Sequence, residues 1–448
     1  GNIEVTTQGK ELCMDAHVCQ GLSFEMAPEY ALRAKACDNV LNTKVNYDNH
    51  SKKLPVKGFL DAETQFGKNE HGMTSINMNV KPSHIMLGDT RWDVISSNIN
   101  YVKNHLSVDN FTVKHDNQHI IVNGKAYPSP EDSIVADLKD VDVAYILNLV
   151  NFHSVDFAGK ATGKAIVKSL FNQPDAYAKL DINDFLFENG PLGVLHAFVN
   201  YNKVDEQIDI KAVADEDKGN QTIIDGYVSP KRNYIDLGIT AVGTNMKFME
   251  SFCGSFMDNI EARASGKVNV VGDLSNINLV GDIEATGKMH MTQLNTEYHF
   301  EKLKAHAIPD DILLRNDTIY DRNGHIAIVD GGIHHKHLTK LSYDLDLKAH
   351  NFLGFDTHEF GDNTFYGTVY ATGNVGIHGK SGETIIDIDA SPDPGSIFVY
   401  NVASPDAISD KSFIHWNDAT PEWEKPFSFE QQAKKNEDNN SISSDMRI

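Results

Sequence analysis

Apolar and polar residues alternate along most of this chain with a period of two. Ile235, Leu237 and Ile239 are separated by polar or small residues, and residues 341–349 and 386–390 follow the same pattern. A period of two places alternate side chains on opposite faces of a strand, which predicts strands with one apolar and one polar face. Glycines and Asn- or Asp-containing turns separate these segments, so the sequence predicts an all-β fold.

Two short sequence markers recur together at intervals of about one hundred residues. The first is Asn-Gly or Asp-Gly after two β-branched residues, at 121–124, 223–226 and 328–331. The second is Ala-Thr-Gly or Ala-Ser-Gly, starting at Ala161, Ala264 and Ala371, with an extra copy at Ala285. Two markers that move together indicate a repeat array, and repeat arrays form elongated proteins.

The markers divide the chain into parts. We predict an N-terminal part of the sheet over residues 1–120 and repeated units over 121–420 (about 121–222, 223–327 and 328–420). A polar loop or linker is predicted over 421–440 and the start of a further strand over 441–448, so the chain is expected to be a piece of a longer protein. Each unit carries a short insert, at 143–150, 249–260 and 352–360; the first two have helical spacing. The inserts are expected to cap the apolar core, with lipid contact as the alternative.

A long sheet with one apolar face cannot leave that face in water, and it cannot stay flat because sheets twist. It must pack against a second sheet or curl lengthwise into a trough. The inward rows mix Ile, Leu and Val with Ala and Gly, which leaves room for an apolar ligand, so we expect a groove that conducts lipid. The candidate residues lining this groove are Ile235, Leu237, Ile239, Val268, Val270, Ile283, Ala285, Met289, Met291, Leu341, Tyr343, Leu345, Leu347, Ile386 and Ile388.

The charge of the chain excludes some classes of partner. Its formal net charge is −23, with 63 acidic and 40 basic residues, which argues against nucleic acid because phosphate contacts need Lys and Arg. The acidic residues lie between apolar ones and are predicted to form a solvated outer face. The longest apolar runs are much shorter than the ~20 residues that a membrane-spanning helix needs.

The sequence offers little support for catalysis or metal binding. No nucleophile elbow or phosphate-binding glycine loop is present, so we expect neither an enzyme nor a bound cofactor. His334, His335 and His337 lack an acidic or cysteine partner at ligand spacing and are predicted to be a solvated turn or strand end, with a metal site as the alternative. Residues 215–220 lack the spacing of an EF-hand and are predicted to be a hairpin turn.

Four cysteines carry little information about the compartment. Cys13, Cys19, Cys37 and Cys253 lack the CxxC spacing of a zinc site. Reduced, buried thiols are predicted, and a disulfide between Cys13 and Cys19 is the alternative.

Several motifs taken together resemble the TamB family, the translocation and assembly module subunits of Gram-negative envelopes. They are the Ala-Thr/Ser-Gly strands, the run Ala264-x-Gly266-x-Val268 continuing to Ile283, and the segments 365–371 and 398–408. The resemblance extends to the AsmA-like, bridge-like lipid-transfer proteins. It implies an elongated β-taco, which is a long curled sheet enclosing an apolar groove.

The resemblance also implies a location and partners. It implies a periplasmic protein with an inner-membrane anchor outside this segment and an Omp85-family outer-membrane partner of the TamA type. The implied activity is phospholipid movement between the inner and outer membranes, in support of outer-membrane biogenesis.

Two other functions are weighed against lipid transfer. A scaffold or chaperone presenting an open β edge to outer-membrane proteins would act by strand addition. An extracellular adhesin would need a closed coil with uniform short rungs, which the long units and inserts disfavour. The sequence leaves the lipid, the direction of transport, the energy source and the oligomeric state open.

Overall fold

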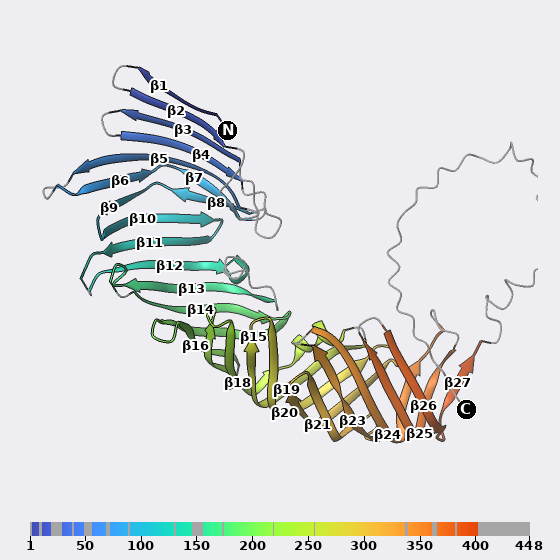
Figure 1. Ribbon diagram of the computed structural model, residues 1–448. Helices are drawn as coiled ribbons and strands as arrows, with labels where there is room; N and C mark the ends of the chain where they lie inside the picture. The colour runs from blue at the N-terminus through green and yellow to red at the C-terminus, as the bar shows by residue number, and fades with distance from the viewer. Residues whose placement is uncertain are drawn as a thin grey trace, which may run out of the picture. The chain divides into compact units, whose positions relative to one another are not determined.

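The computed structural model describes residues 2–401 except 9–10, 19–28, 38–39, 49–55, 69–71, 88–89, 130, 146–155, 173, 218, 255, 337–338, 361–364 and 381–382. The fold is all-β, as predicted, and its strands belong to one long antiparallel sheet (Figure 1). The chain forms two compact units: unit 1 is Gly1–Phe248 with Ala264–Asn278, and unit 2 is Met249–Arg263 with Leu279–Ile448.

The first eighteen strands belong to unit 1. They are β1 (Asn2–Gln8), β2 (Glu11–Val18), β3 (Glu29–Cys37), β4 (Val40–Asp48), β5 (Val56–Lys68), β6 (Thr74–Val80), β7 (Ser83–Leu87), β8 (Thr90–Ile95), β9 (Ser97–Val102), β10 (His105–His115), β11 (Gln118–Ala126), β12 (Ser133–Asp142), β13 (Phe157–Lys168), β14 (Asp175–Phe187), β15 (Gly190–Asn202), β16 (Gln207–Asp217), β17 (Asn220–Ser229) and β18 (Tyr234–Asn245).

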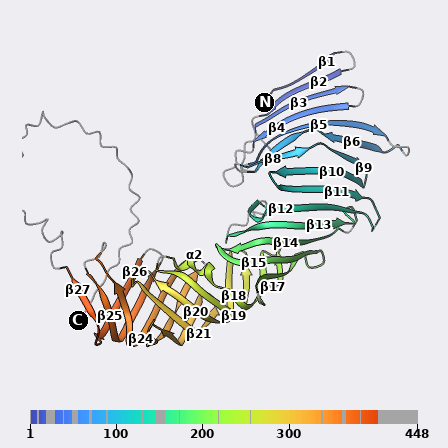
Figure 2. The same cartoon turned by 180° about the vertical axis from the view of Figure 1, so that it is seen from behind.

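The remaining elements belong wholly or partly to unit 2, and Figure 2 labels the short helix α2 among them. They are η1 (Lys247–Met249), α2 (Glu250–Cys253), β19 (Met257–Asp273), β20 (Asn276–Met291), β21 (Thr296–Ile308), β22 (Asp311–Tyr320), β23 (Ile326–Lys336), β24 (Thr339–Thr357), β25 (Phe365–Lys380), β26 (Glu383–Pro392) and β27 (Ile397–Tyr400).

Strand pairing follows chain order with few exceptions. In unit 1, β10 to β18 pair consecutively, and β5 pairs with both β6 and β7. In unit 2, β20 to β26 pair consecutively, and β27 pairs with β25 beside the end of β26. Such consecutive pairing is the simplest route for a chain whose strands are joined by short turns.

Four of the sequence markers correspond to one recurring structural feature, a β-bulge capped by the next strand. At each bulge a residue has positive φ, for example Asp140 at 52° and Asn351 at 49°. The backbone N–H of Asp140 donates to Thr162 Oγ1 at 3.1 Å, and that of Asn351 donates to Thr372 Oγ1 at 2.9 Å. The Thr of Ala-Thr-Gly therefore satisfies the N–H group that the bulge removes from the ladder.

Three further backbone N–H groups are capped in the same way by other side chains. Gly243 N–H donates to Ser265 Oγ at 3.0 Å, and Asn110 N–H donates to Asn123 Oδ1 at 2.6 Å. The N–H of the bulge residue at 316 donates to Asp330 Oδ1 at 2.9 Å. In all five cases the accepting residue precedes a glycine with positive φ. Because bulges bend and twist a sheet, each of them bends the sheet locally.

The helical inserts are shorter than predicted. Residues 143–145 are helical, while 146–150 lie outside the described residues. The second insert forms η1 and α2, but Ile260, at its predicted end, is already in β19. The prediction of a third insert at 352–360 was wrong. β24 continues as a strand through Thr357, with bulges that interrupt the alternation.

Other predictions fall partly or wholly outside the described residues. These are the linker at 421–440, the strand at 441–448 and the side chains of Cys13, Cys19 and Cys37. β16 and β17 form a hairpin, as predicted: Asp217 lies opposite Asn220, and Asn220 Nδ2 donates to Asp217 Oδ1 at 3.1 Å.

Candidate functional site

The apolar face of unit 1 is continuous across ten strands. Each residue of one row lies directly opposite the next in the strand register. The row runs through Val94, Val113, Ile120, Leu138, Gly163, Leu180, Ala197, Ala212, Ile224 and Ile239. Antiparallel pairing at a two-residue period therefore converts the alternating sequence into an apolar band perpendicular to the strands.

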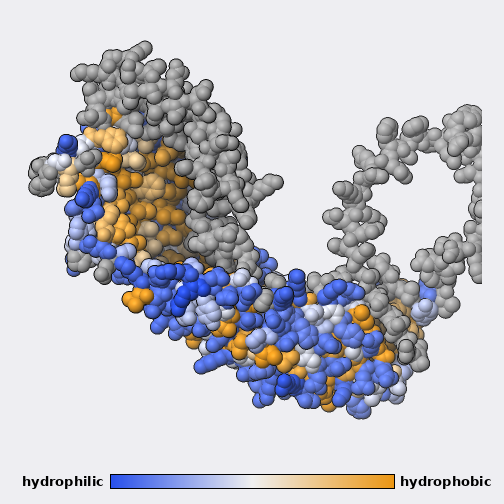
Figure 3. All heavy atoms as spheres, in the orientation of Figure 1, coloured by the Kyte–Doolittle hydropathy of each residue, from blue (hydrophilic) through white to orange (hydrophobic). Residues whose placement is uncertain are grey.

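Parts of this face are buried and parts are open. Trp92, Leu138 and Val141 form one core cluster, against which Tyr145 packs from the first insert. By contrast, Phe66 and Tyr101 lie on the same face in one cross-strand row and remain 40% and 39% exposed. Figure 3 shows the apolar surface of this part of unit 1 as an orange hollow bordered by polar residues. Large apolar side chains therefore line an open concave surface.

Unit 2 carries a matching row. It runs through Ile283, Ala305, Leu314, Gly331, Leu345, Ile377 and Ile386. Leu345 is half-buried between the exposed Asp344 and Asp346. The unit therefore has the same separation of an apolar and a charged face.

All fifteen predicted lining residues are in strands, on the less exposed face of their strand. Unit 1 holds the half-buried Leu237, Ile239 and Val270 with the buried Ile235 and Val268. In unit 2, Ala285, Met291 and Tyr343 are buried, and the half-buried ones are Ile283, Met289, Leu341, Leu345, Leu347, Ile386 and Ile388. The sequence pattern therefore located the apolar face, while contact of these residues with lipid stays a prediction.

Two aromatic contacts cross the apolar face of unit 2. Phe256, just before β19, contacts Tyr343 of β24 with 4.7 Å between ring centroids. Tyr298 of β21 stacks on Phe352 of β24, also at 4.7 Å. Neither pair joins neighbouring strands, so the sheet curves enough for β24 to meet residues from the opposite wall.

A cluster of buried polar groups holds β24 at the second of these contacts. Asp321, in the turn between β22 and β23, is fully buried and accepts hydrogen bonds from the backbone N–H of Asn323, His325 and Leu353 at 2.8 to 3.0 Å. Asp321 Oδ2, which accepts from Leu353, also lies 3.0 Å from His325 Nδ1. Burial raises the pKa of Asp321, but these hydrogen bonds outweigh it, and the net pKa lies below the usual range. The carboxylate is therefore held ionised.

Asp356 is the second buried carboxylate of this cluster. It accepts hydrogen bonds from Thr368 Oγ1 at 2.6 Å and from the Arg322 guanidinium at 2.5 Å. Its backbone N–H donates to Leu294 O at 3.0 Å, beside the turn that joins β20 to β21. Burial raises the pKa of Asp356, but the hydrogen bonds and the Arg322 charge outweigh this effect, so the net pKa lies below the usual range. The cluster thus holds the end of β24, residues 351–357, against the turn between β22 and β23.

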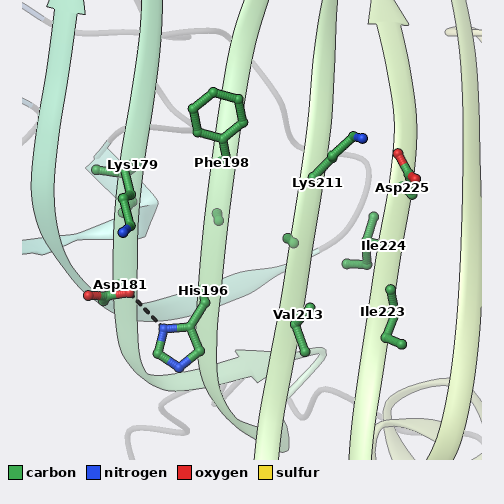
Figure 4. A pocket seen from close by; sticks show the side chains of 12 residues that line it. Lys179, Asp181, His196, Phe198, Lys211, Val213, Ile223, Ile224 and Asp225 are labelled. Carbon is green, nitrogen blue, oxygen red and sulfur yellow. Dashed lines mark hydrogen bonds and ion pairs between the residues drawn. The ribbon is translucent and has the colours of Figure 1, made fainter.

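The outer face of the sheet is polar, with one shallow pocket in unit 1. Figure 4 shows Lys179, Phe198 and Lys211 side by side on this face, with Asp181 bonded to His196 at 2.7 Å. The pocket has a volume of about 450 Å³. Phe198 is 44% exposed, and the Tyr177 ring on the neighbouring strand lies 6.2 Å from it. The sequence analysis missed this pocket; its signal is the run 197–199, which is apolar at three consecutive positions.

The histidine cluster is part of β23 and is less solvated than predicted. His334 Nδ1 lies 2.5 Å from Asp311 Oδ1, so an acidic partner is present after all. His335 is buried, and His337 lies outside the described residues. Within the part of the chain that the structure describes, no three His, Cys, Asp or Glu side chains gather as a metal site.

Two further observations concern helices and thiols. Cys253 in α2 is a free, buried thiol, and burial raises its pKa to about 11. Among the described helices, none has the length and apolar character required to cross a membrane.

Comparison of the chain with protein-family models, with curated proteins and with solved structures gave no match.

Proposed function

We propose that this chain is a non-enzymatic lipid-transfer protein whose apolar sheet face holds phospholipid acyl chains. The observation that carries the proposal is the pair of cross-strand apolar rows, one in each unit, with half-exposed large side chains on the same face. Apart from β15 with β18 and β21 with β24, the strands with extensive mutual contacts are those paired in the sheet. A second sheet therefore does not fill this face among the described strands.

The physical gain from occupying this face is large. Each CH₂ group removed from water contributes about 0.8 kcal/mol. The rows mix Leu and Ile with Ala and Gly, as at Leu180, Ala197 and Ala212. A uniform aliphatic surface binds an acyl chain without a single deep site, so a chain can slide between adjacent positions.

The outer face supports the same function by keeping the sheet solvated. Lys164 lies 3.5 Å from Asp137, and His306 lies 2.7 Å from Asp282, across neighbouring strands. Phospholipid head groups would remain at the open edges of the apolar face, in contact with water. The sheet itself therefore needs no cofactor and no reacting group.

The setting of this function is drawn from the TamB-like motifs. The chain is placed in the periplasm, between an inner-membrane anchor outside this segment and an Omp85-family outer-membrane partner of the TamA type. There it moves phospholipid between the two membranes and supports outer-membrane biogenesis.

Site-specific photo-crosslinking tests the proposal. A photoreactive residue at Leu180 or Leu345, on the apolar face, is expected to crosslink phospholipid in cells of a Gram-negative host. The matched positions are Lys179, next to Leu180, and Lys348, three residues after Leu345; both lie on the opposite face and are expected to give no lipid adduct. Equal crosslinking at both members of each pair, or none at any position, would contradict the proposal.

A second candidate function is presentation of a β edge to outer-membrane proteins. The observation in its favour is β27, where Ile397 and Tyr400 are 64% and 57% exposed and where β25 is the described partner strand. Strand addition at this edge would use those backbone groups of β27 that no described strand pairs with. Crosslinks from Ile397 to a client protein, together with an empty apolar face, would favour this candidate over lipid transfer.

A further inference from the structure

The outer face of unit 1 carries an exposed aromatic ring between two lysines. Lys179 of β14, Phe198 of β15 and Lys211 of β16 lie directly opposite one another in the strand register. Their side chains stand on the same face of the sheet (Figure 4). Phe198 is 44% exposed, and both lysines are exposed as well. The ring is therefore accessible from solvent with a cation on each side.

Other apolar side chains extend this ring into a patch. The Tyr177 ring lies 6.2 Å from that of Phe198. In the next row, Val213 and Ile223 lie directly opposite each other, and Ile223 is 36% exposed. The pocket that Phe198, Val213 and Ile223 line has a volume of about 450 Å³, within the range of about 300 to 1,000 Å³ that is typical of ligand sites. A contiguous apolar group beside a pocket points to a binding partner.

Lys179 and Lys211 are positioned to meet an anionic ligand. Lys179 lies opposite Lys164 in the strand register, and like charges in this arrangement destabilise a sheet. Lys164 lies 3.5 Å from Asp137. In the part of the chain that the structure describes, neither Lys179 nor Lys211 forms an ion pair. A carboxylate of a ligand would supply the counter-charge that these two ammonium groups need.

The acidic residues that line the pocket limit the charge of this ligand. Asp181 is bonded to His196 at 2.7 Å. Asp225 lies opposite Lys211 and is two strands away from Phe198. A polyanion would extend over these carboxylates and be repelled. The charges therefore favour a ligand that carries one or two carboxylates beside an aromatic ring.

The spacing of the row suits an extended peptide that crosses the strands. A strand separation of about 4.8 Å places the Cα atoms of Lys179 and Lys211 about 10 Å apart, with Phe198 midway. In an extended peptide, alternate side chains share one face at intervals of about 7 Å. An aromatic residue can therefore stack on Phe198 while acidic residues two positions before and after it reach the two flexible lysines.

We propose that this pocket binds an extended segment of a partner polypeptide with the pattern acidic–x–aromatic–x–acidic. The aromatic ring of the segment packs on Phe198, Val213 and Ile223, and its carboxylates bind Lys179 and Lys211. The pocket lies on the face opposite to the proposed lipid surface, so the inference does not depend on lipid transfer. It also differs from strand addition, because side chains and not backbone groups of the sheet hold the segment.

Calorimetric titration of the full chain tests the site. The probe is the peptide Ala-Glu-Ser-Trp-Ser-Glu-Ala with an acetylated and an amidated end. It is expected to bind saturably, and more weakly as the salt concentration rises, because salt screens exposed charges. Replacing both Glu residues of the peptide with Gln should weaken binding about fivefold, since two exposed ion pairs are lost. Replacing its Trp with Ala, or both Glu residues with Lys, should abolish binding.

Variants of the chain assign the contacts. Phe198→Ser should weaken binding of the acidic peptide about tenfold or more, because it removes the stacking surface. Lys179→Gln combined with Lys211→Gln should reduce the affinity for the acidic peptide to that for the Gln peptide, and leave the latter unchanged. Lys125→Gln, at an exposed position on the outer face of β11, is the matched control and should bind like wild type. Equal urea midpoints would separate lost binding from lost structure.

Three results would overturn the proposal. The first is the absence of saturable binding of the acidic peptide at concentrations up to about 1 mM. The second is equal affinity for the Glu, Gln and Lys peptides, which would show that the two lysines do not select the ligand. The third is unchanged binding in Phe198→Ser. None of these results bears on the lipid-binding face, because lipid occupancy is measured separately.

Discussion

Single residues explain why this sequence repeats. The Thr of the Ala-Thr-Gly markers at Ala161 and Ala371 accepts the N–H group exposed by a bulge, and the glycine after it brings the neighbouring strand close. At Gly163, φ is 152°, and an added Cβ would lie 2.1 Å from Lys179 O. At Gly373, φ is 157°, and an added Cβ would lie 2.4 Å from Ala390 Cα. The markers are therefore requirements of the bent sheet and not of a ligand.

The glycine of the marker gives the first prediction. Gly163→Ala is expected to destabilise unit 1 by about 2 kcal/mol or more, because the side chain must adopt a strained φ against a neighbouring backbone. The matched control is Gly238→Ala in β18, where the nearest atom to an added Cβ is Asp225 O at 3.4 Å. Urea unfolding measures both, and equal stability of the two variants would contradict this account of the marker.

The hydroxyl of the marker gives the second prediction. Thr162→Val keeps the side-chain shape but removes the acceptor for Asp140 N–H, and should lower the free energy of unfolding by about 1 to 2 kcal/mol. Amide hydrogen exchange at Asp140 should become faster. Thr162→Ser retains the oxygen and should preserve slow exchange at Asp140. If Thr162→Ser exchanges as fast as Thr162→Val, this hydrogen bond does not account for the protection.

At the scale of elements, the end of β24 shows what sequence reasoning could not reach. Alternation stops near Asn351 and Phe352 because bulges interrupt the register there, so the segment resembled an insert. Asp321 and Arg322 lie in the turn between β22 and β23, whereas Asp356 lies near the end of β24. Only the fold brings these residues together. A buried carboxylate cluster of this kind has no local spacing that a sequence can display.

This cluster gives the third prediction, a dependence of unit 2 on pH. The folded-state pKa values of Asp321 and Asp356 lie below those of an unfolded chain, near 4. Their contribution is therefore fully present above that value and is lost as the pH falls through the lower, folded pKa values. Amide protection factors in β22 to β24 should therefore fall as the pH drops below about 4.

A neutral variant checks the origin of this acid sensitivity. Asp321→Asn should exchange faster than wild type at pH 7 and show a smaller further change on acidification, since the ionised group is already absent. Asp346→Asn, at an exposed position of β24, should behave like wild type. An unchanged acid response in Asp321→Asn would place the sensitivity elsewhere in the unit.

At the scale of the molecule, the alternating pattern was enough to predict an all-β fold and to locate the less exposed face. All fifteen candidate residues lie on that face, because strand period and antiparallel register leave one arrangement that buries them. The pattern could not show how the face is closed, since Phe256 with Tyr343 and Tyr298 with Phe352 join segments distant in sequence. It also missed Phe198 and Ile223, which are apolar on the outer face.

The central claim is that the apolar face of each unit holds phospholipid acyl chains. Native mass spectrometry with lipid extraction, on the chain purified from a Gram-negative periplasm, tests it most directly. We predict several phospholipids per chain, and fewer in Leu345→Asp and Ile283→Asp, because a carboxylate on this face resists burial beside acyl chains. Lys348→Asp, on the opposite face, should retain the wild-type number. A folded chain without lipid, or Asp variants that carry as much lipid as wild type, would contradict the account.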